Sequence, residues 1–96
     1  MDVTYSRCAG LDVHKKTVVA CCIIPGRHSR EERQIRTFST VSQDLLALSD
    51  WLSTHEITHV AMESTGEYWK PVYNLLEANF TVLVVNAQHI KTVPGR

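Results

Sequence analysis

The segment at residues 17–24 restricts the possible folds more than any other part of the chain. It reads Thr-Val-Val-Ala-Cys-Cys-Ile-Ile, which is almost unbroken in apolar and β-branched residues. Such a run is typical of a strand that is buried on both faces of a sheet. Pro25-Gly26 follows it directly and indicates a turn. We therefore predict an interior strand that ends in a tight reversal of the chain.

The segments on both sides of this run indicate two further strands. Residues 5–13 precede it, and residues 32–39 follow it with Ile35, Thr37 and Phe38 as their bulky members. The later segment should be the more exposed of the two. Because the connections are short, we expect the three strands to form an antiparallel meander.

The apolar period becomes helical after residue 40. Thr40 followed by Gln43 fits a capping box, in which each side chain bonds a free backbone N–H at the helix start. These features predict an amphipathic helix that ends near Thr54 or His55. Its apolar stripe, at three- and four-residue steps, comprises Val41, Leu45, Leu48 and Leu52.

Strand and helix patterns alternate from residue 57 onward. We predict a strand at residues 57–63, a helix at 67–77, a strand at 80–85, and a loop or short helix at 86–96. Ser64 and Glu67 form a second capping-box pattern. Pro71 is tolerated because the backbone N–H groups of a first helical turn have no intrahelical partner.

Together these segments predict an α/β fold with the order β-β-β-α-β-α-β. Three antiparallel strands followed by right-handed helical crossovers give a mixed five-stranded sheet with helices packed on it. The RNase H-like (RuvC-like) fold begins with this order. In that fold the first and fourth strands are parallel neighbours in the middle of the sheet.

Two carboxylates fall in the strands that would lie side by side in the RNase H-like fold. Asp12 lies in a strand expected to be central and buried, where an unpaired charge is costly. Glu63 ends the fourth strand. Neighbouring strands lie ~4.8 Å apart, so acids on one face can share a divalent ion or hold two ions ~3.5–4 Å apart. The pattern alone leaves open a second interpretation, in which Asp12 caps a turn and Glu63 merely favours a helix start.

Composition gives little direct indication of a partner. Lys plus Arg and Asp plus Glu are ten each, so the basic surface usual for a DNA-binding protein is not evident. An acidic nuclease core can offset basic residues elsewhere. Cys8, Cys21 and Cys22 are a poor disulfide framework, which favours a reduced, cytoplasmic compartment. No apolar run reaches ~18 residues, so we expect no membrane association.

Several stretches resemble a known family when they are read together. They are Gly10-Leu11-Asp12-Val13-His14-Lys15, then Met62-Glu63-Ser64-Thr65-Gly66-Glu67-Tyr68-Trp69, then Val85-Asn86 with Lys91 and Pro94-Gly95-Arg96. In this order they resemble the N-terminal domain of DEDD-motif transposases of the insertion sequence 110 family, which includes the pilin-gene inverting recombinase.

The resemblance implies a RuvC-like catalytic domain that binds Mg²⁺ (or Mn²⁺) through four acids. The first two match Asp12 and Glu63, which become the expected catalytic and metal-binding residues. The last two normally follow the segment that ends here at Arg96. Residues 1–96 are then the N-terminal part of the catalytic domain, without those two acids and without the C-terminal domain.

The same resemblance implies the function and the partners. The parent protein would be a DNA transposase or site-specific recombinase that cleaves DNA and transfers strands with a divalent metal. DNA, a structured guide RNA and further copies of the protein are its expected partners. We expect negligible recombination by this chain alone.

Further residues are weaker candidates for nucleic-acid contact: His14, Lys15, Ser64, Thr65, Tyr68, Trp69 and Arg96. Ser64 and Thr65 are more simply explained as a helix cap, although a helix start can also bind phosphate. Tyr68 and Trp69 are more simply explained by packing than by base stacking. The arginines at 27, 30, 33 and 36 suit a solvated hairpin, with contact to a nucleic-acid backbone as the alternative.

Three other classes of protein are open at this point. His55-Glu56-Ile57-Thr58-His59 matches the H-E-x-x-H motif of zinc proteases, but that chemistry needs a helix where a strand is predicted. An actin-like or sugar-kinase ATPase resembles Gly10-Leu11-Asp12, but residues 13–16 lack the small residues that wrap a phosphate. The third is a non-catalytic nucleic-acid-binding remnant of the same fold, which would bind without any dependence on Mg²⁺.

Overall fold

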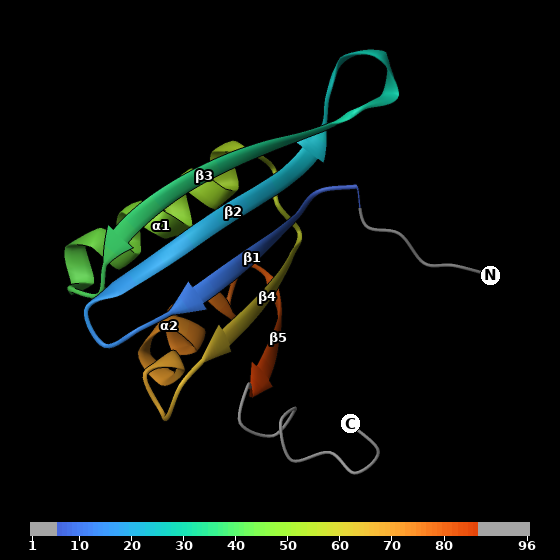
Figure 1. Cartoon of the computed structure of the whole chain (residues 1–96). Coiled ribbons are helices and arrows are strands. Elements are labelled where there is room, and N and C mark those ends of the chain that lie inside the picture. The colour runs from blue at the N-terminus through green and yellow to red at the C-terminus, as the bar shows by residue number, and fades with distance from the viewer. Residues whose placement is uncertain (1–5, 87–96) are drawn as a thin grey trace, which may run out of the picture.

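The computed structural model describes residues 6–86, and its elements follow the expected order with one added 3-10 helix (Figure 1). They are β1 (Cys8–Val13), β2 (Thr17–Pro25), η1 (Arg27–Ser29), β3 (Glu31–Ser39), α1 (Ser42–Thr54), β4 (His59–Ser64), α2 (Trp69–Leu76) and β5 (Thr81–Asn86). The loop or short helix expected at residues 86–96 lies outside the described residues, apart from Asn86, which ends β5.

The five strands form one mixed sheet in the order β3-β2-β1-β4-β5. β1, β2 and β3 pair antiparallel as a meander, whereas β1, β4 and β5 run parallel. α1 carries the chain from β3 to β4, and α2 carries it from β4 to β5. The RNase H-like arrangement expected from the element order is therefore confirmed, with the first and fourth strands side by side.

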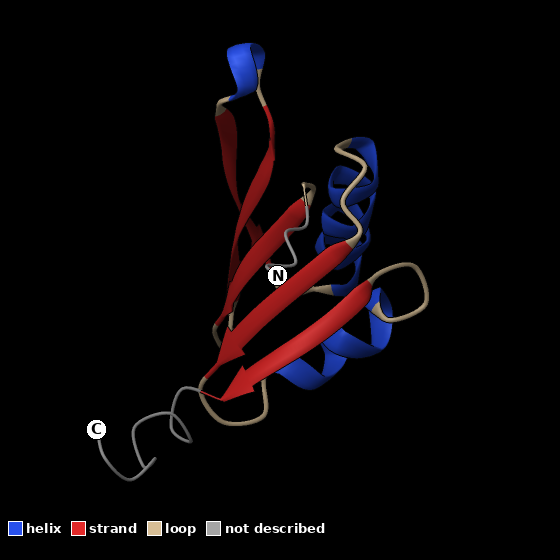
Figure 2. Cartoon of the chain, turned by 90° about the vertical axis from the view of Figure 1, so that its right-hand side faces the viewer, coloured by secondary structure: helices blue, strands red, loops and turns tan. Residues whose placement is uncertain are grey.

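Both helices pack on the same face of this sheet (Figure 2). The core lies between them and the strands, and its largest fully buried side chains include Leu48, Leu52, Met62, Leu76 and Val13. No element within residues 6–86 covers the opposite face (Figures 1 and 2). We call this second side the open face; it presents Gly10 and Asp12 of β1, Val19, Cys21 and Ile23 of β2, Ala61 and Glu63 of β4, and Leu83 and Val85 of β5.

The prediction that residues 17–24 are buried on both faces is wrong for the part of the chain that the structure describes. Val18, Ala20 and Cys22 have no exposed surface, whereas the alternate residues between them are only half buried. A strand with one covered face needs only every second residue to be apolar. β2 is apolar on both faces, and only one face is covered within residues 6–86 (Figure 2).

The first helix begins without the expected capping box. α1 starts at Ser42, and its N-cap, Val41, makes no side-chain cap bond. Instead, the Asp44 carboxylate accepts bonds from the Ser39 N–H at 3.1 Å and the Ser39 hydroxyl at 2.7 Å. These bonds lower the pKa of Asp44 below its usual value. Asp44 therefore joins the end of β3 to the first turn of α1, while Thr40 donates to the Lys15 carbonyl instead of capping.

The second capping box is also absent. Ser64 belongs to β4, is buried, and donates its hydroxyl to the Thr65 carbonyl at 3.1 Å. α2 begins only at Trp69, after a turn in which Gly66 has a φ of +64°. That left-handed conformation favours glycine. Glu67 pairs with Lys70 at 2.6 Å, and this contact lowers the pKa of Glu67.

Two expectations from composition can be compared with the described residues. All three cysteines are free, with Cys22 buried and Cys8 and Cys21 partly exposed. No helix among residues 6–86 combines the length and the apolar character that a membrane span requires.

Candidate functional site

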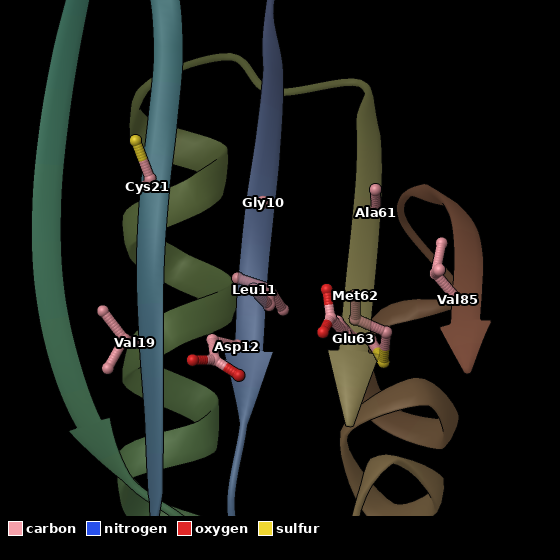
Figure 3. A pocket seen from close by; sticks show the side chains of 9 residues that line it. All are labelled: Gly10, Leu11, Asp12, Val19, Cys21, Ala61, Met62, Glu63 and Val85. Carbon is pink, nitrogen blue, oxygen red and sulfur yellow. The ribbon is translucent and has the colours of Figure 1, made fainter. Parts of the chain in front are cut away.

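Asp12 and Glu63 lie directly opposite each other in the parallel pair of β1 and β4. Their strand neighbours Leu11 and Met62 point into the helix-covered core. Because side chains alternate along a strand, both carboxylates project from the open face. Figure 3 shows this, with the Glu63 carboxylate leaning toward β1. The expected juxtaposition of the two acids, adjacent in register and on one face, is present in the structure.

Asp12 is central in the sheet but is not buried, which corrects the sequence-based expectation. Its side chain is 60% exposed, because nothing within residues 6–86 packs over the open face. Water can therefore solvate the carboxylate, so its charge carries little desolvation cost in this chain.

His14 lies immediately after β1, at the start of the turn into β2. Its backbone N–H donates to the Thr17 carbonyl at 2.8 Å, which closes the turn. Its Nε2 atom lies 3.0 Å from Oδ2 of Asp12. His14 therefore orients the Asp12 carboxylate and brings an imidazole ring to the same end of the sheet.

The two acids offer the donors that a hard divalent cation prefers. Carboxylate oxygens suit Mg²⁺ or Mn²⁺, which retain several water ligands. Within residues 6–86, no Lys or Arg pairs with either carboxylate. The same residues contain no group of three His, Cys, Asp or Glu placed to hold a metal. The arrangement thus fits part of a metal site, supplied by two ligands that would need others to complete it.

The open face is hollowed beside the carboxylates. A hollow of about 500 Å³ extends from Asp12 and Glu63 over Gly10 and Ala61 (Figure 3). A second hollow, of about 510 Å³, continues over Gly10 and Ala61 toward His59. A Cβ at Gly10 would meet no atom within 4 Å. These small residues let a bound molecule approach the backbone beside the acids. We did not predict this groove from the sequence. A signal was present, because Gly10 and Ala61 each lie two positions before an acid in the same strand and therefore on the same face as that acid.

The remaining candidate residues lie in the turns after β1 and β4, at the end of β4 and at the start of α2. Lys15 and Thr65 are exposed in the turns that follow β1 and β4. Ser64 is buried on the helix side, away from the two acids. Tyr68 is 44% exposed, whereas Trp69 is half buried and packs edge-on against Tyr73 with ring centroids 5.8 Å apart. Arg96 lies outside the described residues.

The zinc-protease interpretation does not survive the structure. His55 caps the end of α1, Glu56 has a φ of +57°, and His59 lies in β4. The two imidazoles therefore do not share one helical face. His55 Nδ1 lies 2.9 Å from the Trp51 carbonyl, and His59 Nδ1 lies 2.7 Å from the Thr58 hydroxyl.

Comparison with solved structures defines the class of fold. The chain is similar to RuvC of T. thermophilus in complex with a Holliday junction, with a TM-score of 0.60, 12% identity, and coverage of 91% of this chain and 68% of that one. It is similar to the fowlpox virus Holliday junction resolvase, with a TM-score of 0.59, 13% identity, and coverage of 83% and 60%. An exopolyphosphatase from Cytophaga hutchinsonii follows, with a TM-score of 0.57, 13% identity, and coverage of 85% and 35%. These likenesses establish an RNase H-like, RuvC-like fold.

The sequence comparison then identifies the family. Residues 9–96 match the family model of DEDD transposases of the insertion sequence 110 type, described as "Transposase". The chain therefore belongs to this transposase family. No curated protein matches it at a significant level. The chain spans 60% of the length of the fowlpox virus resolvase to which it is similar.

Proposed function

We propose that the parent protein is a DNA transposase or recombinase that cleaves and joins DNA strands with a divalent metal. In this proposal Asp12 and Glu63 are two of its catalytic metal ligands. The observation that carries the proposal is the direct register pairing of these two acids on one open face. Membership of a transposase family and the fold shared with Holliday junction resolvases support it.

The residues of this chain prepare the site in a definite way. When bound, a divalent ion polarises the phosphodiester and stabilises the attacking and leaving oxygens. Asp12 and Glu63 hold oxygen donors on strands ~4.8 Å apart, so little rearrangement is needed before binding. His14 orients Asp12 through the 3.0 Å contact. Gly10 and Ala61 leave room for a sugar-phosphate backbone to lie against the sheet.

We propose that further ligands complete this site. The family resemblance implies four acids, of which Asp12 and Glu63 match the first two and the other two would follow Arg96. We propose that residues 1–96 by themselves have negligible activity, because a site with two of four ligands holds its metal weakly. We propose DNA as the substrate, a homo-oligomer as the active assembly, a structured guide RNA as a further partner, and the cytoplasm as the location. The guide RNA is proposed from the family resemblance, and the cytoplasmic location is proposed from the free cysteines.

The test compares Asp12→Asn and Glu63→Gln in the protein that extends beyond Arg96. We expect Mg²⁺ and Mn²⁺ affinity to fall by on the order of tenfold to a hundredfold in each, and strand cleavage by at least as much. Glu77→Gln, at the exposed end of α2, is the matched control and should change neither. Unaltered metal affinity and strand transfer in both variants would contradict the proposal.

Two further binding measurements, of DNA with and without Mg²⁺ and of ATP, separate the two remaining alternatives. A non-catalytic remnant would bind DNA equally well with and without Mg²⁺. An actin-like ATPase would bind ATP. The exopolyphosphatase likeness belongs to the fold alone, and residues 13–16 supply no glycine or hydroxyl to wrap a phosphate.

A further inference from the structure

The hairpin of β2 and β3 concentrates the positive charge of the chain. Residues 25–38 contain four arginines against two glutamates, so the hairpin is net positive while the rest of a formally neutral chain is net negative. Figures 1 and 2 show its tip standing clear of both helices. Every side chain of β3 from residue 31 to residue 37 is exposed, on both faces of the strand. We call this segment, residues 25–38, the arm.

The tip of the arm has a defined shape. The Gly26 N–H donates to the Arg30 carbonyl at 2.6 Å, and the Arg30 N–H donates to the Arg27 carbonyl at 3.2 Å. A Cβ at Gly26 would lie 2.6 Å from the Arg30 carbonyl oxygen, so the tight approach requires glycine. His28 completes the turn with a φ of +61°. These bonds fix the backbone from which Arg27 and Arg30 extend.

The acids of the arm do not neutralise the charges of its four arginines. Arg27 and Arg30 are exposed and have no ion pair among the described residues. Arg33 meets Glu31 at 3.6 Å, with both side chains about two-thirds exposed, so water screens the pair strongly. The Arg36 guanidinium lies over the Phe38 ring at 4.8 Å, and its charge also helps to lower the pKa of the Asp44 carboxyl, which lies outside the arm.

The register relates the arm to the two acids. Asp12 is paired with Val19, and Val19 with Thr37, so the carboxylate is two strands away from β3. Arg33 opposite Ile23 lies on the open face, the same side as Asp12 and Glu63. Four residues of strand separate it from Thr37, or ~13 Å. The tip lies farther still, which corresponds to roughly five or more base-pair steps along a duplex at ~3.4 Å each.

We propose that this arm binds the phosphate backbone of duplex DNA on the flank of the strand held by Asp12 and Glu63. The inference rests on the proposed function for its substrate. A two-stranded ribbon fits the major groove of B-form DNA, whereas the major groove of duplex RNA is too narrow and deep for side chains. Arginines at the tip and on both faces of the ribbon suit contacts to both walls of that groove.

The experiment measures binding of a labelled DNA duplex of about 30 base pairs by fluorescence anisotropy, in EDTA, across a salt series. Arg27→Gln with Arg30→Gln should lower the affinity on the order of tenfold and make the salt dependence shallower by roughly two, because each lost phosphate contact removes ~0.9. Lys70→Gln on α2 removes one charge outside the arm and should change neither quantity. Glu32→Gln raises the net charge of the arm and should tighten binding.

The outcomes distinguish this inference from the proposed function. Asp12→Asn should keep the salt dependence of the wild type, since the arm is intact and no metal is present. Equal affinities and salt slopes for the double arginine variant and Lys70→Gln would overturn the arm, whatever the acids do. Tighter binding to duplex RNA than to duplex DNA would overturn the assignment to DNA. Thermal melting of each variant checks that the sheet is intact.

Discussion

The two faces of this sheet are made from the same strands and serve opposite purposes. On the helix side, alternate residues such as Val13, Val18 and Met62 are almost completely buried. On the open face, their sequence neighbours Asp12 and Glu63 are exposed carboxylates, and Leu83 is 63% exposed. Because consecutive side chains alternate, one strand carries both the core and the candidate site. Because the open-face side chains lie outside the core, we expect substitutions there to affect folding much less than substitutions on the helix side.

The largest expected effect tests the covered face. Leu48→Ala removes a fully buried side chain from α1 and should lower the free energy of unfolding by about 2–5 kcal/mol. Leu83→Ala on the open face is the matched control, and its effect should stay within about 0.5 kcal/mol. Urea denaturation followed by circular dichroism measures both. Similar losses in the two variants would mean that the open face also contributes to the core.

The second prediction uses two adjacent cysteines that point to opposite faces. Burial raises the pKa of the Cys22 thiol from 9.0 to about 11. Near neutral pH its thiolate population is then about a hundredfold below that of an ordinary cysteine. We expect iodoacetamide to modify Cys21 and to leave Cys22 unmodified until the protein unfolds. Mass spectrometry after a timed reaction measures this, and equal rates at both positions would contradict the assignment of faces.

The raised pKa of Cys22 also has a consequence at high pH. The unfolded chain loses this proton near pH 9, whereas the folded chain keeps it until about pH 11. The contribution of the protonated Cys22 thiol to the free energy of unfolding is therefore fully present below pH 9 and is lost as the pH rises toward 11. Cys22→Ala should flatten this part of the stability profile, while Cys21→Ala should change it only in part, because the charge of Cys21 is a smaller cause of the raised pKa than burial.

A smaller effect concerns Asp44, which joins β3 to α1. Its pKa is lowered by the two bonds from Ser39, so its contribution to stability is present above its ordinary value of 3.8 and is lost as the pH falls through the lowered value. Asp44→Asn should lower the Tm by a few degrees at neutral pH and by less in acid. Asp50→Asn, exposed on the same helix, is the control. A Tm difference that persists unchanged in acid would show that the bonds do not act through the charge.

The smallest effect tests whether the open face has free space. Gly10→Ala places a methyl group where no atom lies within 4 Å. Alanine loses less backbone entropy than glycine on folding, so the variant should be more stable by about 0.5 kcal/mol. A loss of stability in this chain would show that the space over Gly10 is occupied in solution.

The sequence by itself determined the sheet and the pair of acids. Changes between apolar periods of two and of three to four residues fixed the element order, and short connections with right-handed crossovers left few ways to arrange it. The likeness of that order to the RNase H-like fold predicted Asp12 beside Glu63, because the first and fourth strands are neighbours in that fold. The two predicted capping boxes were wrong, since the Thr40 hydroxyl donates to the Lys15 carbonyl and Ser64 is buried in β4.

Only the tertiary structure decided which surfaces are covered. An apolar run such as residues 17–24 has the same local pattern whether one or two layers pack on it. The difference depends on contacts between segments far apart in the chain. Both helices pack on one face of the sheet. For this reason Asp12 is exposed, the groove over Gly10 and Ala61 is open, and the arm projects beyond the helices. Local sequence specifies the alternation of side chains, and long-range packing specifies which side of that alternation meets water.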